Sequence, residues 1–449
     1  MTSQARRTTL FLLTILYGFG FIDRVVIALV AQDIKVELGI SDFQIGLLGG
    51  SAFAIVNTLA AFPLAQLAER CRRSFVVAGS LAVGSAFTAL CGLAASFWHL
   101  LVLRMGMAIG SSGTEAPAHS MVSDMYGPSR RASALALFML GVPFASILGS
   151  YLGGYMGEQH GWRATFLTFG ISGLAVALIS MYLMHEPARD QHDPQATAGS
   201  LPAIARHLWS HAHFRHLVIG TSIGSLATFG VNTFLPAFLT RNYGLGTSDA
   251  ALLFGLIVGI ASAVGTLMGG FGSEWLARRD ARWLIGAPAA GLLVGAPLLM
   301  LGVTRSNLAL AATLIFFASC FFYTWMGPAI AVTHRLLGSR SRAVGSAVFL
   351  LFMHLVGQGF GPPVIGLVSD QIAARASGDP ELAAQCAQAT SEVAISACDS
   401  ASAIGIRYAI VAFALLYLWT AAHLIRATRA AGMHHEPRVR PSDAPPVQS

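Results

Sequence analysis

Residues 9–33 read TLFLLTILYGFGFIDRVVIALVAQD, an apolar run that is interrupted in its middle by Asp23 and Arg24. A helix of about 20 apolar residues spans the hydrocarbon core of a bilayer, which is roughly 30 Å thick. Lipid offers the backbone no hydrogen-bonding partner, so a helix is the form that such a run takes there. Similar runs recur along the whole chain, which predicts an all-α membrane protein.

The composition agrees with this interpretation. Of the 449 residues, 55% are hydrophobic and only 11% are charged, and the mean hydropathy is +0.64. A soluble protein of this length needs far more charge to cover its surface. A net charge of +7 is also found in nucleic-acid-binding proteins. Here, however, the basic residues lie in short loops between apolar runs, as the positive-inside rule expects. We therefore expect no nucleic-acid partner.

The apolar runs predict twelve spanning helices in two sets of six. The predicted helices cover residues 9–33, 42–66, 75–95, 98–124, 132–156, 163–184, 214–240, 248–272, 283–303, 307–334, 343–370 and 404–427. A polar linker, residues 185–213, separates a first bundle (1–184) from a second bundle (214–427). Residues 428–449 form a tail that is rich in proline and charge, and we expect it to be disordered. No small-residue cleavage site follows the first run, so we interpret it as an uncleaved helix rather than a signal peptide.

Basic residues are distributed unevenly between the two sets of loops. One side collects Arg6, Arg7, Arg70, Arg72, Arg73, Arg130, Arg131, Arg278, Arg279, Arg282, Arg335, Arg340, Arg342, Arg426 and Arg429. The other side holds only Lys35, Arg163, Arg241, Arg305, Arg375 and Arg407. This asymmetry predicts that both termini and the linker face the cytoplasm, in a bacterial inner membrane. A single lysine, Lys35, stands among many arginines, and we attribute this imbalance to base composition rather than chemistry.

The two halves of the sequence match each other at three points in the same order. Ser41-Asp42 opens one predicted helix, and Ser248-Asp249 opens another. The ends of those two helices read PLAQLAERCRR and GGFGSEWLARR, and the later segments GPSRRASALALF and GSRSRAVGSAVF also correspond. Such a duplication predicts two parallel six-helix repeats, an architecture of secondary transporters. The substrate site is then expected near the membrane midplane, between the repeats.

The cysteines fall into two groups. Cys71, Cys91 and Cys320 lie in or beside predicted spans, where they are most simply packing residues. Cys386 and Cys398 lie in an acidic loop between the last two predicted helices. In an oxidising compartment these two would form a disulfide. Two free thiols fit the sequence equally well, because it does not report their separation.

Two stretches carry a family resemblance. Residues 19–50 read FGFIDRVVIALVAQDIKVELGISDFQIGLLGG, and residues 103–143 read LRMGMAIGSSGTEAPAHSMVSDMYGPSRRASALALFMLGVP. Both resemble the Spinster-like branch of the major facilitator superfamily, whereas the second half resembles the superfamily only. The resemblance implies a twelve-helix secondary active transporter that works by alternating access, without cofactor or metal and as a monomer. Animal members of the branch are associated with lysolipids and sphingoid lipids. We therefore expect an amphipathic anionic solute, such as a lysolipid-like molecule or an organic anion, coupled to protons.

The superfamily also has a loop motif after its second helix, Gly-x3-Asp-Arg followed by further basic residues. The corresponding positions here are Ala65, Glu69, Arg70, Arg72 and Arg73. The resemblance implies that Glu69 faces the positive amide end of the eleventh helix and that Arg73 pairs with Asp124. Together with Arg70 these residues would form a cytoplasmic latch, and breaking it would open that side. The alternative is loop charge set by topology alone.

Ionisable residues deep in a span are costly and mark candidate functional sites. At about 100° per residue, Arg104, Ser111, Glu115 and His119 fall on one stripe of a helix, which we expect to line the transport cavity. The branch typically has a glutamate at the position of Ser111. Here the carboxylate stands one turn deeper, at Glu115. Either the carboxylate has moved along the stripe, or Glu115 has a different role.

These residues suggest a mechanism as a hypothesis. Asp23 and Glu115 carry the exchangeable proton, while Arg24 and Arg104 hold the anionic head of the solute. Proton and solute bind in turn and shift the equilibrium between inward-open and outward-open states. The alternative is a static buried ion network. His119 either titrates near neutral pH or only bonds a neighbouring helix.

The second half offers fewer polar candidates, which are Asn232, Tyr323, Trp325, His354 and Gln358. His354 and Gln358 share a helix face at a spacing of four residues. Each of the five is, by itself, more simply structural. An apolar second wall opposite a charged first wall suits an amphipathic solute.

Three other functions remain open. A proton-driven multidrug exporter would use the same charged residues. His119 and Asp124 form the His-x4-Asp pattern of glycerolipid acyltransferases. Residues five apart on a helix diverge by about 140°, however, so we expect no enzyme activity. The third is a receptor that does not transport, because a fold does not fix a function.

Overall fold

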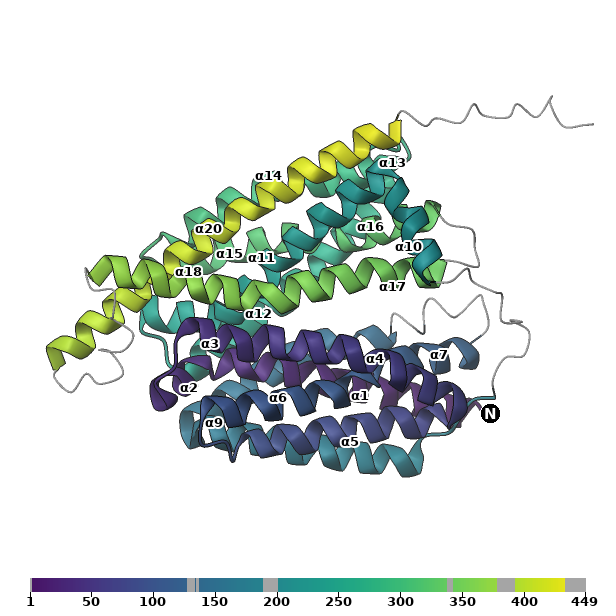
Figure 1. Cartoon of the computed structure of the whole chain (residues 1–449), viewed down its shortest axis with the longest axis horizontal. Coiled ribbons are helices and arrows are strands. Elements are labelled where there is room, and N and C mark those ends of the chain that lie inside the picture. Colours follow the sequence, from purple (N-terminus) through teal and green to yellow (C-terminus); the bar gives the residue numbers. More distant parts are fainter. Residues whose placement is uncertain are drawn as a thin grey trace, which may run out of the picture.

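The computed structural model describes residues 2–126, 134, 137–188, 201–336, 342–377 and 392–432. Across these residues the chain forms helices and no strand. Figure 1 shows two bundles of long helices that lie beside each other, the first coloured purple to blue and the second teal to yellow. This arrangement agrees with the predicted all-α fold of two repeats.

The first bundle comprises α1 (Ser3–Leu29), α2 (Ala31–Leu38), α3 (Asp42–Gly46), the π-helix η1 (Leu47–Ser51), α4 (Ala52–Arg70), α5 (Arg73–Cys91), α6 (Phe97–Ser112), α7 (Glu115–Met125) and α9 (Gly141–Leu183). A short helix, α10 (Leu201–Ser210), precedes the second bundle. That bundle comprises α11 (Ala212–Tyr243), α12 (Thr247–Leu267), the π-helix η2 (Met268–Gly272), α13 (Ser273–Ala277), α14 (Trp283–Val303), α15 (Leu308–Phe322), α16 (Met326–Arg335), α17 (Arg342–Phe352), the π-helix η4 (Met353–Gln358), α18 (Gly359–Ser377) and α20 (Glu392–Gly432).

Within the described residues, ten helical stretches are long and apolar enough to cross a membrane. The difference from the twelve predicted spans lies in two places. The helix predicted at 98–124 is divided into α6 and α7, neither of which is long enough alone. The helices predicted at 132–156 and 163–184 fall in one continuous helical stretch, Leu137–Leu183, most of which is α9.

The 43 residues of α9 exceed one membrane crossing of about 20 residues. Gly161, with φ of +81°, interrupts the helix, and glycine adopts this conformation without a steric penalty. The part of α9 before the interruption packs along α1, from Gly18 to Val30 at the end of that helix. The part of α9 after the interruption packs along α5 in the reverse direction, from Ala89 to Gly79. One continuous element therefore makes both the outward and the return pass.

We call the end of the bundles that holds the start of α1 and α10 the proximal end, and the end that holds α2 and α3 the distal end. In Figure 1 the N-terminus lies at the right and the distal end at the left. The ribbons of the two bundles adjoin at the left and diverge toward the right.

The distal loops are short and carry strong local signals. Gly39, with φ of 62°, ends α2. Ser41 Oγ accepts a hydrogen bond from the Gln44 backbone N–H at 3.2 Å, and Gln44 Oε1 accepts one from the Ser41 N–H at 2.9 Å. This reciprocal capping box fixes where α3 starts and thereby positions the residues of its first turn.

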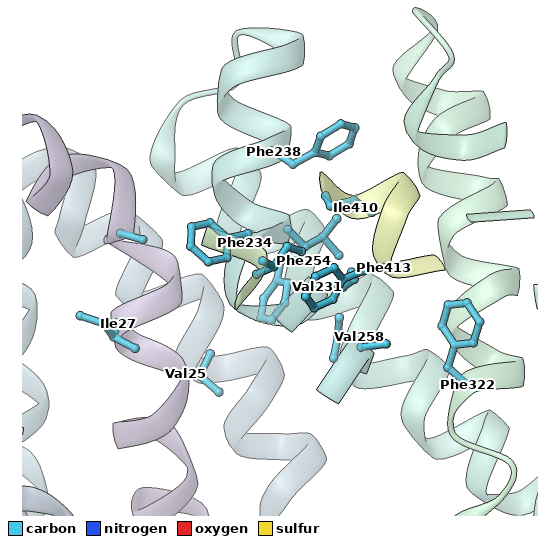
Figure 2. Packing of buried hydrophobic residues seen from close by; sticks show 14 of the residues in the cluster. Val25, Ile27, Val231, Phe234, Phe238, Phe254, Val258, Phe322, Ile410 and Phe413 are labelled. Atoms are coloured by element: carbon cyan, nitrogen blue, oxygen red, sulfur yellow. The ribbon is translucent and has the colours of Figure 1, made fainter. Parts of the chain in front are cut away.

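A hydrophobic cluster crosses between the bundles. Figure 2 shows Val25 and Ile27 of α1 facing a group of side chains that includes Val231 and Phe234 of α11 and Phe254 of α12, and all five belong to one continuous buried cluster. The two bundles therefore share one core rather than meeting only through polar contacts.

Candidate functional site

The centre of the molecule is marked by a broken helix. Gly113 and Thr114 separate α6 from α7, and Glu115 is the first residue of α7. A carboxylate is favoured at this position because the helix N-terminus is positive. The Glu115 side chain is exposed and lies close enough to Tyr17 of α1 for its charge to act on that hydroxyl. Glu115 thus presents a carboxylate to open space rather than to packed protein.

Arg24 of α1 lies near this carboxylate. Its guanidinium carbon is 5.1 Å from the centre of the Phe53 ring. Its charge acts on Tyr17, on which the charge of Glu115 also acts. The Nε atom of Arg24 is buried and has no hydrogen-bond partner in the described part of the chain.

The second bundle contributes His354 to the same region. His354 lies in the π-helix η4 and feels the charges of both Arg24 and Glu115 across the space between the bundles. Gln358, four residues further along the same helix, is buried beside it. The structure thus brings together predicted residues that are more than 200 positions apart in the sequence.

The four residues of the predicted stripe on the fourth helix lie in different surroundings in the structure. His119 packs its ring edge-on against Phe138 at 5.2 Å, and its Nε2 has no partner in the described part of the chain. Ser111 is buried, and Asn57 donates a hydrogen bond to its hydroxyl at 3.4 Å. Arg104 is fully buried, and its Nε donates to the Leu48 carbonyl at 3.0 Å. In this conformation Arg104 and Ser111 face packed protein, whereas Glu115 faces open space.

Asp23 lies on α1 beside Arg24, but its side chain is outside the described part of the structure. Its role as a proton carrier stays a prediction.

The second bundle has a matching broken helix. Residues 323–325 separate α15 from α16, as residues 113–114 separate α6 from α7. Beside this break, Asn232 donates a hydrogen bond to the Tyr323 hydroxyl at 2.8 Å. Buried Trp325 has an indole N–H without a partner among the described residues. Discontinuous helices that meet near the midplane form the binding sites of many transporters.

A charged cluster around Arg73 contains an ion pair that the family resemblance implied. Arg73 Nη1 lies 2.5 Å from Asp124 Oδ2, and Arg73 Nε lies 3.0 Å from Glu186 Oε1. Burial raises the pKa of Glu186, but hydrogen bonds from Ser74 and the Arg73 guanidinium outweigh this and hold it below its usual value. Glu186 was not among the predicted site residues, because it follows the sixth predicted span at the start of the polar linker.

The rest of the predicted latch is only partly visible. Arg70 is exposed. The side chain of Glu69 and the residues just before α17 lie outside the described part of the structure.

The distal end holds a second charged cluster that the sequence analysis did not predict. Asp42, 1% exposed, accepts hydrogen bonds from Lys35 at 2.7 Å and from Arg241 at 2.7 and 2.8 Å. Burial and the charge of Arg241 together lower the pKa of Lys35. Ser369 also donates to Asp42 at 2.7 Å. Lys35 is therefore a partner in an ion network.

A further acidic contact lies beside this network. The Thr247 hydroxyl is 3.5 Å from both carboxylate oxygens of Asp33. Burial raises the pKa of Asp33 to about 6, and the nearby Glu158 contributes to the rise, whereas the Thr247 hydroxyl opposes it. These contacts join the first bundle to the second and close the distal end.

The structure bears on both predictions about the cysteines. Cys398 is disulfide-bonded, and Cys386, its predicted partner, lies outside the described residues. Cys91 and Cys320 are buried, as packing residues would be, whereas Cys71 is exposed at the end of α4.

Comparison with known proteins gives one consistent result. The model of the Major Facilitator Superfamily matches residues 10–362. The chain is 32% identical over 356 residues to an MFS-type efflux pump of Mycolicibacterium smegmatis, across 79% of this chain and 82% of that protein. It is 24% identical over 371 residues to the sphingosine-1-phosphate transporter SPNS2 of Xenopus tropicalis, across 79% of this chain and 72% of that protein.

Among solved structures, the chain is similar to a bacterial homologue of the human lysosomal transporter Spinster in an inward-facing, unoccupied conformation. The TM-score is 0.86 and the identity 31%, and the match covers 96% of this chain and 98% of the other. This likeness extends over both bundles. The chain therefore belongs to the major facilitator superfamily of multi-pass membrane transporters, and within it to the Spinster-like branch.

Proposed function

We propose that the protein is a proton-coupled secondary transporter that moves an amphipathic, anionic solute, such as a lysolipid-like molecule or an organic anion, by alternating access. The observation that carries the proposal is the exposed carboxylate of Glu115, which lies between the bundles with Arg24 and His354 around it. Ionisable groups at membrane depth are costly, and they are usually retained where a proton, an ion or a substrate passes.

The solute class is inferred from the two walls of the site. The first bundle supplies the cation Arg24, whose Nε has no hydrogen-bond partner in the described part of the chain. The second bundle supplies neutral or aromatic groups, among them Tyr323 and Trp325. One charged and one largely apolar wall favour a solute with an anionic head and an apolar body. The name of the relative from Xenopus tropicalis, a transporter of a phosphorylated sphingoid lipid, supports the same class.

The conformation is inferred from the distal contacts. The ion network around Asp42 and the contact of Asp33 with Thr247 hold the distal ends together, while the bundles diverge toward the proximal end. The similar solved structure is inward-facing. We therefore take the proximal end to be the cytoplasmic one, which agrees with the arginine-rich loops there, and we place both termini in the cytoplasm of a bacterial cell.

Transport by purified protein in liposomes tests the proposal. We would measure the uptake of an anionic lysolipid, a small organic anion and a cationic dye, each with and without an imposed proton gradient. We expect the gradient to accelerate the flux of the anionic amphiphile. Glu115→Gln and Asp23→Asn should each abolish this acceleration without lowering the melting temperature.

Glu274→Gln is the matched control, because Glu274 is an exposed carboxylate on α13, away from the site. Normal coupling in both Glu115→Gln and Asp23→Asn would contradict the proton assignment. Gradient-driven flux of the dye without flux of either anion would instead favour a multidrug exporter, the activity named for the mycobacterial relative.

A further inference from the structure

Two helices that close the distal end carry the same sequence pattern. Residues 149–158 read GSYLGGYMGE, and residues 361–370 read GPPVIGLVSD. In both segments the first and sixth residues are glycine and the tenth is a carboxylic acid. The first segment is the distal part of the outgoing pass of α9, and the second is the middle of α18. The pattern thus recurs at corresponding places in the two bundles.

The two acids make corresponding contacts with the opposite bundle. Glu158 Oε2 accepts a hydrogen bond from the Ser248 backbone N–H at 2.8 Å, in the first turn of α12. Asp370 accepts hydrogen bonds from the backbone N–H groups of Asp42 at 3.0 Å and Phe43 at 2.9 Å, at the start of α3. The first N–H groups of a helix have no partner within the helix, and its N-terminus attracts negative charge. Each acid therefore caps a helix that belongs to the other bundle.

The glycines four residues earlier allow these caps to form. A Cβ atom at Gly154 would lie 2.5 Å from Ala251 Cβ and 3.0 Å from Ser248 Cα. A Cβ atom at Gly366 would lie 2.2 Å from the Asp42 carbonyl oxygen. Any larger residue would push the two bundles apart at the places where the carboxylates reach across. The glycine and the acid thus act as one unit in each segment.

The contacts run in opposite directions between the bundles. Glu158 of the first bundle caps a helix of the second bundle, and Asp370 of the second bundle caps a helix of the first. The capped helices begin at the two Ser-Asp pairs, 41–42 and 248–249, that mark the internal duplication. The same contact, between a carboxylate on one helix and the first N–H groups of another, is therefore present twice, related by the symmetry of the bundles.

We propose that Glu158 and Asp370 are reciprocal helix caps that hold the distal ends of the two bundles together while the proximal side is open. They release when the distal end opens. Water replaces each carboxylate at the freed N–H groups, so the contact is reversible at modest cost. This inference requires that the bundles move relative to each other, and it is independent of the solute and of proton coupling.

Distances between spin labels at Val36 and Ser306 test the inference without any solute. Both side chains are exposed at the distal end, one in each bundle. The labels would be attached in a Cys71→Ser background, because the Cys71 side chain is exposed and would compete for the label. We expect Glu158→Ala and Asp370→Ala each to raise the ratio of long to short distances on the order of tenfold, and the double variant to raise it further.

Three further variants identify the cause. Glu158→Gln keeps a hydrogen-bond acceptor and should restore part of the short-distance population. Gly154→Ala should act like Glu158→Ala although it keeps the carboxylate. Gly270→Ala is the matched control, because a Cβ atom there meets no heavy atom within 4 Å.

Folding is checked by melting temperature and by size-exclusion profile in every variant. Folded Glu158→Ala and Asp370→Ala proteins with the wild-type distance distribution would overturn the inference. An equal shift in Glu274→Ala would also overturn it, because Glu274 lies away from the distal end. A liposome assay that finds no proton-driven transport leaves the distance result unaffected, so the two proposals fail separately.

Discussion

The distal network and the central site use the same residue types in opposite ways. At the distal end, Asp42 is 1% exposed and accepts four hydrogen bonds from three side chains. In the centre, Glu115 is exposed, and Arg24 Nε has no hydrogen-bond partner among the described groups. A buried charge with all its partners stabilises one arrangement of the bundles. An exposed charge with few partners is available to a ligand that binds transiently.

The comparison shows that a membrane-buried charge does not by itself mark a substrate site. The cost of burying an ion is offset either by fixed partners or by a bound ligand. Burial and partner count therefore separate residues that hold a conformation from residues that bind. Four variants, in order of expected effect, test this distinction.

The largest effect is expected from Asp42→Ala. It leaves Lys35 and Arg241 buried beside each other without their shared carboxylate. Removing one partner of a buried ion network typically costs about 3–5 kcal/mol. We expect a large fall in melting temperature and loss of the closed distal end, measured by the Val36–Ser306 label distance. Asp249→Ala is the matched control, since Asp249 occupies the equivalent position in the second bundle but is exposed. Equal effects of the two variants would refute the distinction.

Arg24→Gln should act on binding rather than on folding. A hydrogen bond to a charged group contributes about 1.5–3 kcal/mol. We expect the KM for an anionic solute to rise on the order of tenfold, with little change for a neutral analogue of the same shape and in the melting temperature. A parallel loss of affinity for both analogues would assign Arg24 a structural role instead.

Acidification should favour the closed distal end through Asp33. Its pKa is about 6 in the closed arrangement, chiefly because of burial, against an ordinary value of 3.8. When the distal end opens, Asp33 meets water and its pKa returns toward the ordinary value. The closed state then binds the proton more tightly. Lowering the pH from 8 to 5 should increase the ratio of closed to open states by up to about tenfold.

Label distances measured across this pH range, in the wild type and in Asp33→Asn, check the assignment. The variant should lose most of the dependence, because the amide that replaces the carboxylate does not titrate. An unchanged pH profile in Asp33→Asn would place the proton on another group.

The smallest effect is expected from Glu37→Gln. Glu37 pairs with Arg163 at the distal end, but the two side chains are 50% and 37% exposed. Exposed ion pairs contribute about 0–1 kcal/mol. The melting temperature should therefore fall by no more than a few degrees. A loss as large as that of Asp42→Ala would mean that exposure does not decide which distal pairs matter.

The sequence allowed much of the fold to be predicted, because apolar length and loop charge are local properties. The resemblance also pointed to Arg73 and Asp124, which form an ion pair in the structure. The distal network could not be predicted in this way, since Asp42 and Asp370 are 328 positions apart and neither lies in a pattern that marks the other.

The matched pairs Ser41-Asp42 and Ser248-Asp249 illustrate the limit of sequence patterns. The two pairs are identical in sequence, yet Asp42 is buried and Asp249 is exposed. The difference depends on what the opposite bundle places beside each helix start, which only tertiary structure reveals. The same holds for Arg104, whose place on the predicted stripe did not show that its side chain would be sealed against Leu48.

The composition of the distal interface has a consequence for the opposite conformation. When the bundles part there, the carboxylates of Asp33, Asp42, Glu158 and Asp370 are uncovered, and the cations that bond them among the described side chains are Lys35 and Arg241. The mouth that opens is therefore electronegative at neutral pH, and counterions from solution would gather in it. Such a mouth would repel an anionic solute that approaches from the distal side, most strongly at low ionic strength.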